Sequence, residues 1–373
     1  MEKLGPRKIG ILGAGFISDF HIRALKGIPG IAVAAVCDTE RHKAESLARK
    51  WGIGQSFSSL DAMLSAGVVN TIHILVPPIY HADAALQCLE KGCDVFMEKP
   101  MTTTADQARE LQKAAARLGR SVGVNHNFTC NPAFVKLVRA VREWRLGEVQ
   151  HVTACWNVPL RQLDAGQHTH WMFQEPGNII VEQGAHPLSL VCYLLGKVTD
   201  VSVIVTGKTT LNSGREFYNT WQCSLVCERG TAQIYLSFGR EWFDFWVHAG
   251  GQDGSAVADI GRNRFSITEK SRFMEPVDQF LDAGKVSCRV FGQGTRNLVD
   301  YCRGFLKLAP PQDPYSIGMR GSIEQFYEDL LGGRPPREGV DKGVNVIEAC
   351  AAIADNRLET SQLAPAREAV ERG

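Results

Sequence analysis

The sequence predicts an α/β protein, with a doubly wound parallel sheet near the N-terminus followed by an α+β domain that contains a large, mostly antiparallel sheet. Two observations carry this prediction. In the first third of the chain, short and almost wholly apolar runs alternate with helical stretches, which is the pattern of a parallel sheet covered on both faces. Further on, long runs rich in β-branched and aromatic residues follow one another without helices between them, and such runs favour antiparallel pairing.

The N-terminal alternation can be followed element by element. Predicted strands lie at 8–12, 32–37, 69–75, 94–97 and 121–125. Predicted helices end near Lys26 and span 40–51, 80–91 and 105–118. Right-handed crossovers between such strands produce a doubly wound sheet.

Composition narrows the class of protein. The 373 residues include 41 Lys and Arg against 40 Asp and Glu, so the net charge of +1 gives no attraction for nucleic acid. No apolar run reaches the roughly 18 residues of a membrane helix, and the first residues lack the pattern of a secretory signal. Eleven scattered cysteines, with no Cys-x-x-Cys pair, are typical of reduced thiols. We therefore expect a cytoplasmic protein that binds neither nucleic acid nor membrane.

A glycine-rich loop follows the first predicted strand. Gly13 permits a tight turn, and Gly15, which lacks a Cβ, lets a pyrophosphate approach the backbone where the next helix begins. Ser18 takes the third position of the Gly-x-Gly-x-x-Gly pattern and is still small enough for helix–strand packing. A Gly-x-Gly alone also marks ordinary turns, but this position between strand and helix predicts dinucleotide binding.

Asp38 ends the second predicted strand. A carboxylate at this place hydrogen-bonds the hydroxyls of an adenosine ribose. Because its charge repels a 2′-phosphate, NAD is the expected cofactor and NADP is disfavoured. Arg41 and His42 follow closely and soften that preference.

Glu98, Lys99 and Pro100 come directly after the predicted strand at 94–97. Ligands of open α/β sheets bind at the carboxyl ends of the strands, so the Lys99 ammonium is placed to hydrogen-bond the cofactor ribose and a substrate hydroxyl. The proline belongs to the turn, and its peptide bond can be cis. The alternative is a solvated charge pair that contributes little to stability.

Several motifs together resemble those of the glucose–fructose oxidoreductase, inositol dehydrogenase and MocA family (Gfo/Idh/MocA). They are GILGAGFIS with His21, Cys37-Asp38, VPPIYH at 76–81, VFMEKPM at 95–101, VNHNF at 124–128 and GNIIVEQGAHPLSLVCYLLG at 177–196. The resemblance implies a Rossmann domain, a largely antiparallel second sheet, and a lysine with an acid–x–x–x–histidine pair as catalytic groups. We divide the chain into an NAD-binding Rossmann domain, 1–126, and a substrate-binding and oligomerisation domain, 127–373.

The second domain is also interpretable by itself. Strands are predicted at 149–156, 198–205, 218–227, 231–238 and 242–249, and helices at 132–144, 322–331 and 342–356. Several of these strands alternate apolar and polar residues, as if one face packs on helices. The family uses the other face of this sheet for oligomerisation, so we expect a homodimer or homotetramer.

Glu182 and His186 are four residues apart, which places them on one face of a helix. Histidine titrates near neutrality and can accept a hydroxyl proton as hydride leaves the same carbon. A core histidine that merely satisfies its hydrogen bonds is the alternative, but the position matches the family's catalytic histidine. Glu182 stands where the family more often has aspartate, and Ser189 where many members have a second one.

The predicted site residues form three groups. The catalytic group is Lys99, Glu182 and His186; the cofactor group is Gly13, Gly15, Phe16, Ile17, Asp38, Arg41, Val76, Pro77, His81, Glu98, Lys99 and Asn127; the substrate group is Lys99, His126, Trp156, His168, His170, Trp171, Glu182 and His186. His168 and His170 raise the question of zinc, but no third strong ligand has fitting spacing, so no metal is predicted.

These residues predict NAD-dependent oxidation or reduction of a secondary hydroxyl of a sugar, glycoside or cyclitol. Lys99 holds the hydroxyl and favours the developing alkoxide, and either His186 or Lys99 takes the proton. Two alternatives stay open. One is an NAD-dependent glycosidase that works by transient oxidation and elimination, and the other is a non-catalytic NAD-sensing regulator, against which the presence of both Lys99 and His186 argues.

Overall fold

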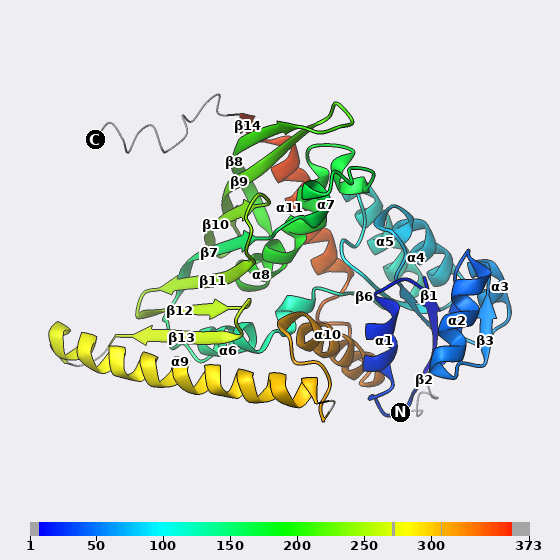
Figure 1. Cartoon of the computed structure of the whole chain (residues 1–373), viewed down its shortest axis with the longest axis horizontal. Coiled ribbons are helices and arrows are strands. Elements are labelled where there is room, and N and C mark those ends of the chain that lie inside the picture. The colour runs from blue at the N-terminus through cyan, green and yellow to red at the C-terminus, as the bar shows by residue number, and fades with distance from the viewer. Residues whose placement is uncertain (1–6, 271–272, 307, 360–373) are drawn as a thin grey trace. The chain divides into compact units, whose positions relative to one another are not determined.

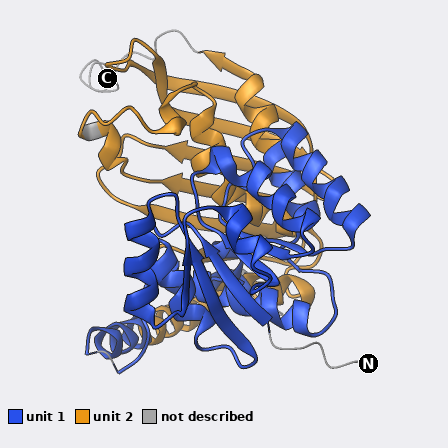
Figure 2. Cartoon of the chain, turned by 90° about the vertical axis from the view of Figure 1, so that its right-hand side faces the viewer, with its two compact units in different colours: residues 1–135, 294–348 blue, residues 136–293, 349–373 orange. Residues whose placement is uncertain are grey.

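The computed structural model describes residues 7–270, 273–306 and 308–359, and the chain forms two compact units (Figure 2). Unit 1 combines the N-terminal stretch up to Val135 with Gly294–Glu348, and unit 2 combines Lys136–Gln293 with the stretch from Ala349 onward. The predicted boundary at residue 126 follows the order of the chain, whereas the compact units interleave, because a later segment returns to the first unit.

Unit 1 is built on a six-stranded sheet in the order β3-β2-β1-β4-β5-β6, with every neighbouring pair parallel. The strands are β1 (Arg7–Leu12), β2 (Ile31–Cys37), β3 (Gln55–Phe57), β4 (Thr71–Ile74), β5 (Asp94–Met97) and β6 (Val122–Val124). This order is the doubly wound one, and it confirms the fold class predicted for this part of the chain. The short β3 is mostly exposed, so it carries no apolar run that would predict a strand.

The helices of unit 1 follow the strands in turn. They are α1 (Ser18–Leu25), α2 (Arg41–Trp51), α3 (Leu60–Ser65), α4 (His81–Glu90) and α5 (Ala105–Leu118), joined late in the chain by α10 (Pro314–Leu331). Their ends follow ordinary capping chemistry: Thr104 accepts the Gln107 N–H at the start of α5, and Gly119 ends it in the left-handed conformation.

The core of unit 1 joins the sheet to α1 and α10. Ile9, Ile11 and Val36 from the strands are fully buried against Ile22 and Leu25 of α1. Helix α10 adds Met319, Ile323, Phe326, Tyr327 and Leu330 to the same cluster. A helix from the last sixth of the sequence therefore completes the nucleotide-binding unit.

Unit 2 is built on an eight-stranded sheet in the order β13-β12-β11-β7-β10-β9-β8-β14. The strands are β7 (Val149–Asn157), β8 (Val198–Thr210), β9 (Glu216–Cys227), β10 (Gly230–Ser237), β11 (Asp244–Gly251), β12 (Gly254–Asp259), β13 (Arg264–Glu269) and β14 (Arg357–Glu359). Only the β7–β10 and β8–β14 pairs are parallel among those described, so the sheet is mostly antiparallel, as predicted.

The remaining helices include the longest element of the described chain. They are α6 (Pro132–Arg142), α7 (Arg161–Asp164), α8 (Ala185–Leu195), α9 (Glu275–Phe305) and α11 (Val340–Asp355). Figure 1 shows α9 in yellow, running past the edge strand β13. None of the described helices is both long and apolar enough to span a membrane.

Candidate functional site

The loop after β1 has the shape that a dinucleotide requires. Gly13 has φ +102°, and a Cβ at this residue would lie 2.6 Å from the carbonyl oxygen of Leu75, so only glycine fits. At Gly15 a Cβ would meet nothing within 4 Å, which leaves its backbone accessible to a ligand. Ser18 is buried and donates its hydroxyl to the Gly15 carbonyl at 2.6 Å. Ser18, which stands where the motif has its third glycine, therefore stabilises the loop by this hydrogen bond and does not obstruct it.

Asp38 is fixed where β2 ends. One of its carboxylate oxygens accepts the Ala14 N–H at 2.8 Å, and the other accepts the Glu40 N–H at 2.9 Å. The first bond ties the acid to the glycine loop itself. Arg41, in contrast, is directed to Glu45, at 2.8 Å, on the exposed side of α2.

A cavity of about 570 Å³ opens beside these residues within unit 1. Its lining includes Gly13, Gly15, Asp38, Val76 and Pro77. Five residues of the predicted cofactor group thus line one cavity. Two others lie on the loop beside it: Phe16 is 82% exposed, and Ile17 is half-buried.

Lys99 follows β5 at the carboxyl edge of the parallel sheet, in a half-buried position. The Lys99–Pro100 peptide is cis. His81 is fully buried beneath this turn, with Nδ1 2.8 Å from the Pro100 carbonyl oxygen and Nε2 2.8 Å from that of Val76. The imidazole therefore links the lysine turn to the loop that lines the cavity, which makes His81 a positioning residue in this structure.

Glu98, next to Lys99, is the end of a buried chain of hydrogen bonds. Its carboxylate accepts from the Asn125 amide at 2.6 Å and lies 2.8 Å from Nε2 of His21. His21 Nδ1 lies 2.8 Å from His73 Nδ1, and His73 Nε2 lies 2.8 Å from the hydroxyl of Tyr327. The chain thus runs from the turn, through α1 and β4, to α10.

Protonation states follow from these contacts. Burial raises the pKa of the Glu98 carboxyl, but the bond from His21 and its nearby charge outweigh burial, so the pKa lies below its usual value. Burial lowers the pKa of the His73 imidazole well below its usual value. One arrangement that satisfies every group has Tyr327 donating to His73, His73 to His21, and His21 to the Glu98 carboxylate.

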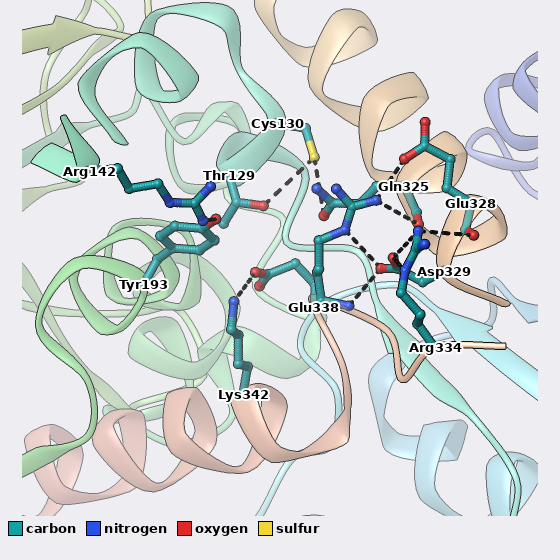
Figure 3. Close-up of polar contacts among 11 residues, drawn as sticks. Thr129, Cys130, Arg142, Tyr193, Gln325, Glu328, Asp329, Arg334, Glu338 and Lys342 are labelled. Carbon is teal, nitrogen blue, oxygen red and sulfur yellow. Dashed lines mark hydrogen bonds and ion pairs between the residues drawn. The ribbon is translucent and has the colours of Figure 1, made fainter. Parts of the chain in front are cut away.

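The segment after β6 is held in place by a residue that lies far from it in the sequence. Glu338 is buried and lies 3.0 Å from Nδ1 of His126, and its backbone oxygen accepts the Val124 N–H at 2.9 Å. Figure 3 shows the second partner of the Glu338 carboxylate, the ammonium of Lys342, at 2.7 Å. His126, which is 3% exposed, is part of this supporting structure, and Asn127 beside it is 2% exposed.

A second buried carboxylate, Asp329, anchors the loop that carries Glu338. Arg334 contacts one oxygen at 3.2 Å (Figure 3). Arg337 contacts the other oxygen at 2.9 Å. Burial raises the pKa of the Asp329 carboxyl, but the bonds from Arg337 and Arg334 hold it below its usual value. The loop is therefore fixed by ion pairs before it reaches β6.

In unit 2, Glu182 lies in a π-helical turn, Ile180–Gly184, that precedes α8. The prediction of one continuous α-helical face through Glu182 and His186 does not describe this turn, because a π-helix has a different period. The indole N–H of Trp171 donates to the Glu182 carboxylate at 2.8 Å. Trp171 and Glu182, which are both predicted substrate residues, are thus brought together.

His186 is 8% exposed at the start of α8. Its ring lies against the indole of Trp156, with centroids 4.9 Å apart, and Trp156 packs on Phe245 at 4.6 Å. Ser189 donates its hydroxyl to the His186 carbonyl at 2.7 Å. The predicted base therefore rests on an aromatic support from β7 and β11.

His168 and His170 each accept a hydrogen bond from a backbone N–H group. His168 accepts the Asn212 N–H at 3.3 Å, and the exposed His170 accepts the Met172 N–H at 3.3 Å. Within the described residues, no group of three or more His, Cys, Asp or Glu could hold a metal ion.

Sequence reasoning missed three residues of this arrangement. His73 stands in the middle of the apolar strand β4, and a buried histidine there was a usable signal. Tyr327 and Glu338 are more than 200 residues from the groups they contact, and no local pattern points to them.

Family models match both parts of the chain. The oxidoreductase family model with an NAD-binding Rossmann fold matches residues 7–126, and the GFO/IDH/MocA C-terminal domain model matches residues 134–257. The chain belongs to this family. The predicted resemblance and the NAD-binding character of the first unit are thereby confirmed, and the glycine loop, Asp38 and the cavity beside them fit that cofactor.

Curated relatives cover different shares of the chain. D-glucoside 3-dehydrogenase of Escherichia coli (strain K12) is 31% identical over 197 residues, 51% of this chain and 54% of that protein. Inositol 2-dehydrogenase of Rhizobium meliloti (strain 1021) is 26% identical over 261 residues, 68% of this chain and 76% of that protein. The chain thus spans about half the length of the first of these relatives.

Solved structures share the fold along nearly the whole chain. Levoglucosan dehydrogenase, in a complex with NADH and levoglucosan, has a TM-score of 0.76 at 15% identity, covering 94% of this chain and 96% of that chain. At this identity the likeness shows the fold alone.

Proposed function

We propose that this protein catalyses NAD-dependent oxidation or reduction of a secondary hydroxyl of a sugar, glycoside or cyclitol. The observation that carries the proposal is Lys99 at the carboxyl end of β5, next to the half-buried carboxylate of Glu98, in a unit of an NAD-binding family. Names of the relatives, a glucoside dehydrogenase and an inositol dehydrogenase, support the class of substrate.

Lys99 binds the reacting hydroxyl in this proposal. An ammonium group stabilises the negative charge that develops on oxygen as the carbon–hydrogen bond breaks. The bonds from His21 and Asn125 keep Glu98 in place, and the contacts of His81 keep the turn in place. The lysine is thus presented by a rigid support, and rigidity of this kind is what lets a charged group favour a transition state.

His186 accepts the hydroxyl proton as the hydride leaves the same carbon, so the products are a ketone and the reduced cofactor. When bound, NAD supplies the hydride acceptor. Lys99 is the alternative proton acceptor. Glu182 and Trp171, joined by their hydrogen bond, together with Trp156, His126, His168 and His170, are the proposed substrate contacts.

We further propose that the protein is a cytoplasmic homodimer or homotetramer that assembles through the sheet of unit 2. The support is the alternation in β9, where Gln222, Ser224 and Val226 are exposed between the buried Trp221, Cys223, Leu225 and Cys227. All eleven cysteines are free, which agrees with a reducing compartment.

The test is a panel of free sugars, inositols and aryl glycosides, each with NAD and with NADP, followed by the absorbance of the reduced nicotinamide. Accumulation of NADH with at least one secondary alcohol supports the proposal. Release of the aryl group without net NADH identifies a glycosidase instead. Tight NAD binding with no turnover of any compound identifies a regulator.

A further inference from the structure

Helix α9 presents its apolar side chains outward. Phe280 is 79% exposed, Leu298 62%, Tyr301 65% and Phe305 75%. Large apolar side chains gathered on one exposed helix are unusual on a monomer and mark an interaction surface.

Leu298 and Phe305 belong to a row of exposed residues with the spacing of a coiled coil. Steps of four and three residues alternate along the whole helix through Val277, Leu281, Gly284, Cys288, Phe291, Thr295, Leu298, Cys302 and Phe305. We call this row the α9 seam. Every member of the row is exposed. An apolar repeat of this period sustained over four heptads indicates a helix that pairs with another helix.

The opposite side of α9 fixes which way the seam points. Gln293 bonds both backbone groups of Phe265 in β13, accepting its N–H at 2.8 Å and donating to its carbonyl at 2.9 Å. Asp282 accepts the Thr268 hydroxyl at 3.1 Å. These contacts attach a mostly polar stripe to the edge strand, so rotating the seam inward would break them.

We propose that the α9 seam pairs with the α9 seam of a second copy of this chain, in antiparallel orientation. Antiparallel pairing places the positive end of each helix dipole beside the negative end of the other, whereas parallel pairing places like ends together.

The antiparallel register places Leu281 against Leu298 of the second copy, and Cys288 against Phe291. The exposed aromatic and leucine side chains of two such helices amount to roughly 1,000 Å² of apolar surface, at about 150–250 Å² for each aromatic. That area is about the minimum that a specific interface buries. A helix of this length is about 46 Å long, so the seam is a contact distinct from the sheet face proposed above.

The charges on α9 favour a protein partner over a lipid surface. The helix carries both signs of charge, with Lys285, Arg289, Arg296 and Arg303 beside Asp278, Asp282 and Asp300. Helices that lie on anionic membranes carry a predominantly basic polar face, which this mixture does not provide.

The test compares solution masses by sedimentation at a series of concentrations. The double variant Leu281→Glu/Leu298→Glu places four like charges in the pair, and its mass is expected to be half that of the wild type. The matched control Gln279→Glu/Ala283→Glu adds the same charge outside the seam and is expected to keep the wild-type mass. Circular dichroism and NAD binding, unchanged in all variants, show that the units are folded.

Orientation is tested by the variant Leu281→Glu/Leu298→Lys. The antiparallel register pairs each glutamate with a lysine of the other copy, so this variant is expected to recover the wild-type mass. Equal masses for the wild type and the double glutamate variant would overturn the proposal. A wild type whose mass stays constant across the concentration series, but which binds anionic phospholipid vesicles through the seam, would also overturn it. Neither mass result depends on turnover, so the proposed function is tested independently of this inference.

Discussion

The polar site residues of the two units are held in different ways. In unit 1, the groups around Lys99 are fixed by buried hydrogen bonds that come from four separate elements and end on backbone carbonyls or carboxylates. In unit 2, Glu182 and His186 lie within one short segment. Glu182 accepts a hydrogen bond from the indole of Trp171, and His186 packs against the indole of Trp156. We propose that unit 1 holds the cofactor and the reacting hydroxyl rigidly, while unit 2, which also carries His186, adapts to the substrate.

The largest effect is expected from Lys99→Ala. Because the ammonium, in the proposed mechanism, both holds the hydroxyl and stabilises its charge, turnover is expected to fall by about 10³-fold, with NAD affinity within a few-fold of the wild type. Steady-state kinetics and NAD titration measure the two quantities. Lys91→Ala, an exposed lysine that ends α4, is the matched control and should leave both unchanged. Equal loss in both variants would remove Lys99 from the mechanism.

His186→Asn comes next, with an expected loss of about 10²-fold in turnover. The asparagine keeps a polar group against Trp156 but cannot take up the proton. If unit 2 adapts to the substrate, the KM for the polyol rises as well, whereas the dissociation constant for NAD does not. His151→Asn, in β7 of the same unit, serves as the control. A rise in the NAD dissociation constant with unchanged turnover would contradict this division between the units.

Asp38→Ala is expected to act on the cofactor alone. Loss of the carboxylate removes its hydrogen bonds to the ribose and its repulsion of a 2′-phosphate, so the KM for NAD rises by about tenfold and that for NADP falls. The ratio of the two kcat/KM values is the measurement. A variant that keeps the wild-type ratio would show that another residue sets the preference.

The smallest expected effect is on stability, through His73. Its pKa is lowered in the folded state by burial, so below a pH of about 6.5 the unfolded chain binds a proton that the folded one does not. The free energy of unfolding is therefore expected to fall by up to about 1.4 kcal/mol per pH unit as the pH drops further.

Denaturant titrations between neutral pH and about pH 5 measure this slope. His73→Gln should show a shallower slope than the wild type, whereas Tyr327→Phe, which keeps the imidazole, should retain it. The groups that face His73 are His21 and Tyr327, with Glu98 beyond His21. A wild-type slope in the His73 variant would mean that another of these groups is responsible.

Much of unit 1 could be predicted because its signals are local. Gly13, Gly15 and Asp38 lie close to the loop they build, and every parallel strand except β3 is an apolar run in the sequence. His126 shows the limit of this reasoning: its buried partner Glu338 comes from the far end of the chain, so no local pattern predicts that contact. The π-helical turn at Glu182 could not be predicted either, because the spacing of residues in the sequence does not show where a helix contains an inserted residue.

The central strands of the unit 2 sheet were predicted, but the strands at one edge of it were not. The strands from Val149 to Gly251 carry long β-branched runs, but β12 and β13 are shorter and half-exposed. Helix α9 was not predicted, because Gly284, Gly292, Gly294 and Gly304 weaken helix propensity by about 1 kcal/mol each. Its apolar repeat can be recognised in the sequence, but only the structure shows that the repeat faces outward.

The most direct test of the central claim uses a polyol that the protein oxidises, labelled with deuterium at the carbinol carbon. If the enzyme removes hydride from that carbon, the NADH recovered carries one deuterium at C4 of the nicotinamide for each ketone formed, as measured by mass spectrometry. Recovery of unlabelled NADH, or of product whose carbinol carbon keeps its deuterium, would contradict the account.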